Sequence, residues 1–182
     1  VPLTKDKKHD LTAMLKAIDS DTKMIYICNP NNPTGTICDR ENLISFIKEA
    51  TKKAIVFVDE AYIDFTKEQS LCNLVLENKN LIITKTFSKM YGLAGARVGY
   101  AVANASTIDE LNALKSSPGL SISLVSTAGA IASLNDEKFI KEVYTANEEV
   151  KKYTIDQLTQ LNLTCIPSYS NFIYFSLENY RK

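Results

Sequence analysis

The sequence lacks the features that would mark a metal-binding, nucleic-acid-binding or membrane-spanning protein. Its four cysteines lie far apart without a CxxC pair, which argues against a zinc or other metal site and against a disulfide framework. Lysine plus arginine and aspartate plus glutamate both number 21, so the net charge is zero and no basic face for nucleic acid is indicated. No apolar run approaches the roughly 20 residues of a membrane helix. We therefore expect a globular cytoplasmic protein with reduced thiols and with no nucleic-acid or membrane partner.

Both ends of the sequence look truncated. The first residues, "VPLTKDKKHD", have neither an initiator methionine nor the layout of a signal peptide. The last residues, "LENYRK", directly follow a strand-like stretch. We therefore expect the sequence to be a fragment of a longer protein.

Strand-like and helix-like patterns alternate along the chain. Short apolar runs predict strands over residues 24–28, 54–58, 80–84 and 98–103. Helical periods predict helices from residue 11 and over residues 39–52, 69–77, 107–115, 123–134 and 136–160, with Asp10 and Asp39 as N-caps of the first two. This alternation predicts an α/β fold with a mostly parallel sheet flanked by helices.

The pattern changes after residue 135. The helical segment 136–160 is long enough to link two domains, and two strand-like stretches, "LTCIPS" and "NFIYFSL", follow it. We expect residues 1–135 to form part of a large domain, residues 136–160 to link it to the next, and residues 161–182 to begin a smaller α+β C-terminal domain.

Three polar segments follow three of the predicted strands directly. They are "NPNNPTG" (29–35) after strand 24–28, "DEAY" (59–62) after strand 54–58, and "KTFSK" (85–89) after strand 80–84. In open parallel sheets the ligand lies at the carboxyl ends of the strands. We therefore expect the side chains of these segments to converge on one crevice.

The second and third segments contain groups suited to charged ligands. Asp59 ends a buried strand, where a carboxylate is costly without a partner. Its partner would be a cationic ligand atom or a metal, or else Asp59 caps a helix or joins a structural ion pair, and the segment leaves these alternatives open. Thr86, Ser88 and Arg97 offer two hydroxyls and a guanidinium, a combination that suits a phosphate group.

Two lysines flank these hydroxyls. A lysine held in an apolar crevice beside cationic groups has a lowered pKa and can form a Schiff base with a carbonyl, whereas Lys85 or Lys89 taken alone is more typical of a solvated surface residue. A carboxylate, a phosphate-binding set and an amine together suit pyridoxal 5'-phosphate (PLP). Its ring nitrogen, phosphate and aldehyde need these three groups.

The motifs "NPNNPTG", "DEAY" and "TFSKMYGLAGARVGY" resemble those of the fold-type I PLP-dependent aminotransferases of classes I and II. The opening "VPLTKDKKHDLTAMLKAIDSDTKMIYICNPNNPTGT" and the form "DEAYIDF" look most like histidinol-phosphate aminotransferases. The resemblance covers nearly the whole chain, with the motifs in the family's order. It implies the PLP-binding large domain of that fold, a homodimer, and transfer of an amino group between small molecules.

The resemblance also implies roles for individual residues. Lys89 would hold the cofactor covalently and, once freed, would serve as general base and acid. Arg97, Thr86 and Ser88 would bind the phosphate of PLP. Lys85 has no comparable role in the family pattern.

The remaining roles concern the cofactor ring. By the same resemblance, Asp59 would bond the pyridine nitrogen, and Tyr62 and Asn32 would donate to the phenolic oxygen. Imidazole-acetol phosphate and glutamate are the substrates that the resemblance favours, which would place the protein in histidine biosynthesis.

Other functions stay open. The segment "SSPGLSISLVSTAGA" (116–130) departs from the "RxPFNVN"-like turn of histidinol-phosphate aminotransferases, so the substrate is not fixed by the motifs. A decarboxylase of an amino-acid phosphate on the same scaffold is one alternative, because the PLP-binding residues do not decide which bond at Cα breaks. The other is a non-catalytic aminotransferase-like domain that binds PLP as a regulatory ligand.

Overall fold

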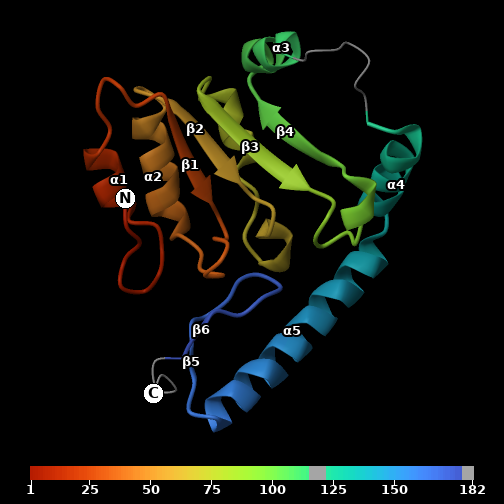
Figure 1. The fold of residues 1–182 in the computed structure, drawn as a ribbon. Coiled ribbons are helices and arrows are strands. Elements are labelled where there is room, and N and C mark those ends of the chain that lie inside the picture. The colour runs from red at the N-terminus through yellow and green to blue at the C-terminus, as the bar shows by residue number, and fades with distance from the viewer. Residues whose placement is uncertain (115–121, 178–182) are drawn as a thin grey trace.

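The computed structural model describes residues 1–114 and 122–177, and its centre is a four-stranded sheet (Figure 1). The strands are β1 (Met24–Cys28), β2 (Ile55–Asp59), β3 (Leu81–Thr86) and β4 (Gly99–Ala103), in the order β1-β2-β3-β4. The first three are parallel, and β4 runs antiparallel to β3. The register places Cys28, Asp59 and Thr84 side by side. The α/β class and the mostly parallel sheet are thus confirmed.

Helices precede, connect and follow these strands, and α1 to α5 lie close to the positions that the sequence predicts. They are α1 (Leu11–Lys16), α2 (Arg40–Ala50), α3 (Ala105–Ala113), α4 (Leu124–Leu134) and α5 (Glu137–Gln160), with short 3₁₀ helices η1 (Ile63–Phe65), η2 (Cys72–Leu76) and η3 (Ala94–Ala96). The predicted N-caps are confirmed, since the side chains of Asp10 and Asp39 accept hydrogen bonds from backbone N–H groups of α1 and α2 at 2.9 Å. The helix predicted over 69–77 is shorter and is 3₁₀ in form.

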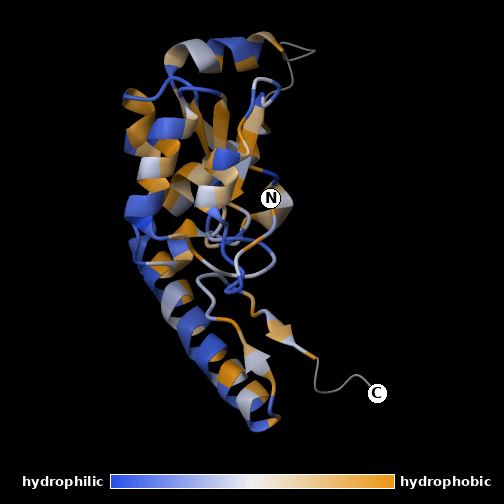
Figure 2. Cartoon of the chain, turned by 90° about the vertical axis from the view of Figure 1, so that its left-hand side faces the viewer, coloured by the Kyte–Doolittle hydropathy of each residue, from blue (hydrophilic) through white to orange (hydrophobic). Residues whose placement is uncertain are grey.

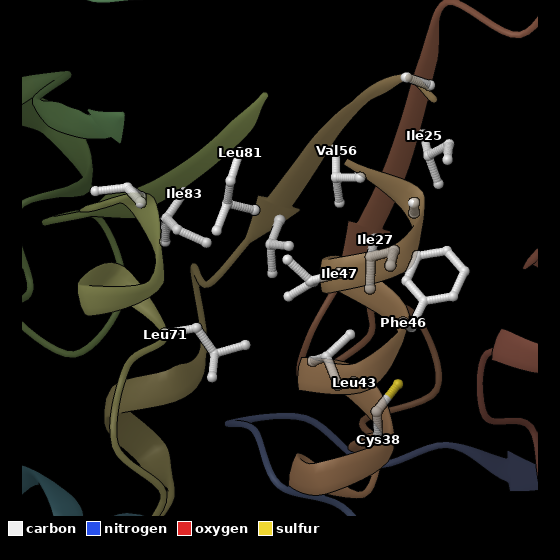
Figure 3. Close-up of a cluster of buried hydrophobic side chains, with 14 residues drawn as sticks. Ile25, Ile27, Cys38, Leu43, Phe46, Ile47, Val56, Leu71, Leu81 and Ile83 are labelled. Atoms are coloured by element: carbon white, nitrogen blue, oxygen red, sulfur yellow. The ribbon is translucent and has the colours of Figure 1, made fainter. Parts of the chain in front are cut away.

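The main hydrophobic core lies between one face of the sheet and α2 (Figure 3). Leu43 and Ile47 of α2 are almost fully buried against Ile27 and Val58 of the strands. Burial of each such side chain contributes about 1.5–3 kcal/mol to stability. The core therefore fixes β1, β2 and β3 beside one another, and with them the three segments that follow these strands.

The chain beyond α4 leaves the sheet along α5, the longest helix, on which hydrophilic and hydrophobic residues interchange (Figure 2). β5 (Thr164–Cys165) and β6 (Phe175–Ser176) follow it as an antiparallel pair. The predicted strands "LTCIPS" and "NFIYFSL" are thus both wrong in extent, since only two residues of each are strand. The hydroxyls of Ser168 and Ser170 bond to the carbonyl of Phe172, and this turn takes residues 168–172 out of the ladder. The division into domains stays a prediction.

The structure also bears on the segment 116–130 and on the expected absence of membrane-spanning helices. Residues 116–121 of the segment that departs from the family pattern lie outside the described residues. Among residues 1–114 and 122–177, none of the helices combines the length and hydrophobicity needed to cross a membrane.

Candidate functional site

A cleft of about 550 Å³ lies at the carboxyl ends of β1, β2 and β3. All seven residues predicted to act on a cofactor line it: Asn32, Asp59, Tyr62, Thr86, Ser88, Lys89 and Arg97. The parallel register brings the three segments to the same edge of the sheet, as the topology leads us to expect. The described part of the chain contains no group of three or more histidine, cysteine, aspartate or glutamate side chains placed to hold a metal ion.

The loop 29–35 is fixed by buried side chains. The side-chain oxygen of Asn29 accepts a hydrogen bond from the backbone N–H of Cys38 at 2.8 Å. The amide of Asn31 donates to the Thr34 hydroxyl at 2.8 Å, and the peptide bonds before Pro30 and Pro33 are cis. Asn29 and Asn31 therefore hold the loop, whereas Asn32 is exposed on its cleft side.

Asn32 and Tyr62 form a pair inside the cleft. The Asn32 amide donates a hydrogen bond to the Tyr62 hydroxyl at 3.2 Å. The hydroxyl accepts through its oxygen, so its own proton is available for another acceptor. The pair therefore offers two neighbouring donors, the second Asn32 N–H and the Tyr62 O–H, to an oxygen atom in the cleft.

The Tyr62 ring is held by two residues from other parts of the chain. Phe172 contacts it edge to face, with ring centroids 5.1 Å apart at 88°, and the Lys89 ammonium nitrogen lies 5.4 Å from its centroid. Sequence reasoning missed Phe172. No local pattern places a residue of the C-terminal segment against "DEAY", since the contact depends on the path of α5.

The Asp59 carboxylate receives a hydrogen bond on each oxygen. Oδ1 accepts from the backbone N–H of Ala61 at 3.0 Å, and Oδ2 accepts from the Tyr26 hydroxyl at 2.8 Å. Sequence reasoning missed Tyr26 as well. The signal was available, because alternate residues of a strand share a face and Tyr26 stands two positions before Cys28, at the cleft end of β1.

The other side of the cleft carries the groups suited to a phosphate. The Ser88 backbone N–H donates to the Thr86 hydroxyl at 3.1 Å, which ends β3 in a tight turn. Arg97 adopts a left-handed backbone conformation (φ 51°), and its guanidinium donates to the carbonyl of Ala94 at 3.0 Å. Arg97 is exposed and keeps further donors for an anion.

The two lysines of this region differ in their partners. Lys85 forms an ion pair with Asp64 at 2.7 Å. Burial alone would lower the pKa of Lys85, but the hydrogen bond and charge of Asp64 outweigh it and raise the pKa above the usual value. Lys85 is therefore held as a structural cation, in agreement with its lack of a role in the family pattern. Lys89 is exposed to the cleft and contacts the face of Tyr62.

Glu60 points away from the cleft and has a structural role. Its side chain is 1% exposed, and it accepts hydrogen bonds from the Ser70 hydroxyl and from the backbone N–H of Leu71. These bonds join the end of β2 to the start of η2. The two neighbouring carboxylates of "DEAY" thus have different surroundings, since Asp59 faces the cleft and Glu60 faces the protein interior.

Glu60 leads to an expected pH dependence of stability. Burial raises the pKa of the Glu60 carboxyl above its usual value, although the hydrogen bonds from Ser70 and Leu71 oppose the rise. As the pH rises above 4.5, the unfolded chain loses this proton before the folded protein does. The free energy of unfolding therefore falls with rising pH in the window between 4.5 and the higher pKa of the folded state. Glu60→Gln is neutral throughout. We expect its free energy of unfolding relative to the wild type to increase by up to about 1.4 kcal/mol for each pH unit of the window.

Urea unfolding of both proteins from about pH 4 to about pH 8 measures this difference. Glu149→Gln is the matched control, because it removes the same charge from an exposed position of α5. A difference between Glu60→Gln and the wild type that stays constant with pH would contradict the prediction.

The chain is similar to known proteins over nearly its full length. Residues 1–180 match the family model described as aminotransferase class I and II. The histidinol-phosphate aminotransferase of Moorella thermoacetica is 38% identical over 179 residues, which is 96% of this chain and 46% of that protein. The chain thus spans about half the length of this relative.

Solved structures agree with this similarity. The crystal structure of histidinol-phosphate aminotransferase from Sinorhizobium meliloti in complex with pyridoxal-5'-phosphate has a TM-score of 0.90 at 29% identity, over 98% of this chain and 48% of that chain. A decarboxylase from Sulfurospirillum multivorans has a TM-score of 0.78 at 26% identity, over 100% of this chain and 54% of that chain. From the family match over residues 1–180, the chain belongs to the class I and II aminotransferases.

Proposed function

We propose that the protein is a PLP-dependent aminotransferase. Its amino donor would be glutamate and its acceptor imidazole-acetol phosphate, as in histidine biosynthesis. The observation that carries the proposal is the convergence of an amine, a carboxylate and a phosphate-binding set on one cleft. The similarity to the histidinol-phosphate aminotransferase of Moorella thermoacetica supports the choice of substrates.

The groups in the cleft fit PLP. Asp59 would bond the ring nitrogen, since both its oxygens keep an unused lone pair beside their bonds to Ala61 and Tyr26. The Asn32–Tyr62 pair offers two donors to one oxygen, which suits the phenolic oxygen of the cofactor. The phosphate would bind to Thr86, Ser88 and Arg97, and Lys89 would hold the cofactor covalently.

When bound, PLP supplies an electron sink that stabilises negative charge at the substrate Cα. Lys89 would take the Cα proton of the amino donor as general base and would deliver it to C4' of the cofactor as general acid. Asp59 would keep the ring nitrogen protonated by providing a fixed anion beside it. Tyr62 would position Lys89, because its ring lies under the ammonium group.

A decarboxylase is the second candidate. The similarity to the Sulfurospirillum multivorans decarboxylase favours it, at a TM-score of 0.78 and 26% identity. The residues that bind PLP are shared by both reactions, so they do not select which bond at Cα breaks. A non-catalytic PLP-binding domain is less well supported, because Lys89, Asp59 and Arg97 are all present in the cleft.

We further propose that the protein is a cytoplasmic homodimer. The free thiols of Cys28, Cys38, Cys72 and Cys165 support a reducing compartment. On α4, Leu124 and Val125 are 87% and 84% exposed, and such exposed apolar side chains support a subunit interface.

Two half-reactions test the proposed function. PLP is added to the whole protein and its visible absorption is recorded. We expect glutamate to bleach the band of lysine-bound PLP, and imidazole-acetol phosphate to restore it. Aspartate as the donor is the control for substrate choice. Release of carbon dioxide from an amino-acid phosphate, with the band kept in the absence of any acceptor, would contradict transamination and favour the decarboxylase.

A further inference from the structure

The Tyr26 side chain lies on the face of the sheet that leads into the cleft. In the β1–β2 register Tyr26 stands opposite Phe57, and Asp59 is the next residue of β2 on the same face. The Tyr26 and Phe57 rings stack with centroids 5.7 Å apart and planes 29° apart. The stack orients the phenol along the sheet, so that its hydroxyl points at the end of β2.

The hydroxyl bonds to the one carboxylate in the cleft that is suited to a cofactor ring. It donates to Oδ2 of Asp59 at 2.8 Å, while Ala61 N–H donates to Oδ1 at 3.0 Å. A donor on each oxygen fixes both the position and the plane of the carboxylate. Rotation about the last side-chain torsion of Asp59, which is otherwise broad, would break at least one of the two bonds.

At neutral pH the Tyr26 hydroxyl is always the donor in its hydrogen bond to Asp59. Burial raises the pKa of the Tyr26 hydroxyl, and the hydrogen bond to the Asp59 carboxylate raises it further. The phenol therefore stays protonated and acts as donor. Each oxygen of Asp59 keeps a lone pair, so the bond does not block a further donor from the cleft.

We propose that Tyr26 is a positioning residue for the cofactor, whose hydroxyl fixes the Asp59 carboxylate in the orientation that receives the ring nitrogen of PLP. This inference rests on the proposed function. Tyr26 acts through Asp59. With Tyr26 included, β1 contributes to binding of the cofactor ring in two ways. Its own side chain Tyr26 holds Asp59, and the loop that follows β1 provides Asn32.

Tyr26→Phe tests the proposal, because it removes the hydroxyl and keeps the ring that stacks on Phe57. We expect the dissociation constant of PLP from the whole protein to rise about threefold to tenfold, because a carboxylate held by Ala61 alone must be oriented during binding, at a cost comparable to one hydrogen bond. We also expect the visible circular dichroism of bound PLP to change, since it reports the orientation of the ring. The thermal unfolding midpoint of the PLP-free protein is expected to fall by no more than about 2–4 °C, because the same bond is present there and the ring stays in place.

Tyr153→Phe is the matched control, because it removes the same hydroxyl from an exposed position of α5 and should leave all three measurements unchanged. Wild-type affinity and circular dichroism in Tyr26→Phe would overturn the proposal. Tighter binding would also overturn it, since the hydroxyl would then compete with the ring nitrogen for Asp59. A wild-type protein that does not bind PLP would contradict the proposed function itself, and is recognised before any variant is made.

Discussion

Replacing Lys89 with alanine is expected to abolish covalent capture of PLP and to lower transamination by about 10²–10⁴-fold, the usual contribution of a general acid–base group. Lys89 is the exposed amine of the cleft, whereas Lys85 is held by Asp64 at 2.7 Å. The variant retains Arg97, Thr86 and Ser88, so it should still bind PLP through the phosphate. The visible band of lysine-bound cofactor measures capture, and glutamate-dependent turnover measures the reaction.

Two further measurements distinguish the amine from its charge. Lys89→Arg keeps a cation over the Tyr62 ring but cannot form the covalent bond, so it should behave like the alanine variant. Borohydride reduction of the PLP-loaded wild type followed by trypsin digestion should give a labelled peptide over residues 86–97. A label on Lys85, or normal turnover in Lys89→Ala, would show that the amine is assigned wrongly.

The sequence predicts the cleft because each of its walls follows a strand with a strong local signal. Runs such as "MIYIC" and "AIVFV" are short, apolar and rich in β-branched residues, which makes them recognisable without tertiary information. Parallel packing then brings the ends of these strands together at one edge of the sheet. The neighbourhood of Asn32, Asp59 and Lys89 follows from these two facts.

The contacts that could not be predicted depend on the path of the chain. One feature of this kind is the antiparallel direction of β4 (Gly99–Ala103). The turn before β4 has Arg97 in a left-handed conformation, which is uncommon for arginine and so is not predicted from the residue type. The contact of Phe172 with Tyr62 is another, because it depends on where the segment after α5 returns the chain to the sheet. Local periodicity contains neither piece of information.

The roles of neighbouring carboxylates could be separated only by their surroundings. "DEAY" places Asp59 and Glu60 together, and strand alternation implies that they face opposite sides. The structure shows which side is which, since Glu60 bonds to Ser70 and Leu71 in the interior, and Asp59 bonds to Tyr26 at the cleft. This difference makes Asp59 the carboxylate whose loss should affect the cofactor.

Replacing Asp59 with asparagine is therefore expected to weaken PLP binding and to lower transamination by roughly 10–100-fold, the effect of about 1.5–3 kcal/mol from a hydrogen bond to a charged group. The amide keeps the shape of the carboxylate, but it has one oxygen, so it can accept from Ala61 or from Tyr26 and not from both. The anion that would hold the ring nitrogen protonated is lost. PLP titration measures the first effect and glutamate-dependent turnover the second.

Asp59→Glu is the informative comparison, because it restores the charge but moves the carboxylate by one methylene. If charge alone matters, Asp59→Glu should recover most of the activity. If orientation matters as well, as the bonds from Ala61 and Tyr26 indicate, the variant should recover PLP binding better than turnover. Equal activity of Asp59→Asn and the wild type would contradict the role of Asp59. In that case Tyr26 would position a group that takes no part in the reaction. The proposal for Tyr26 therefore depends on the prediction for Asp59, and Asp59→Asn should be measured first.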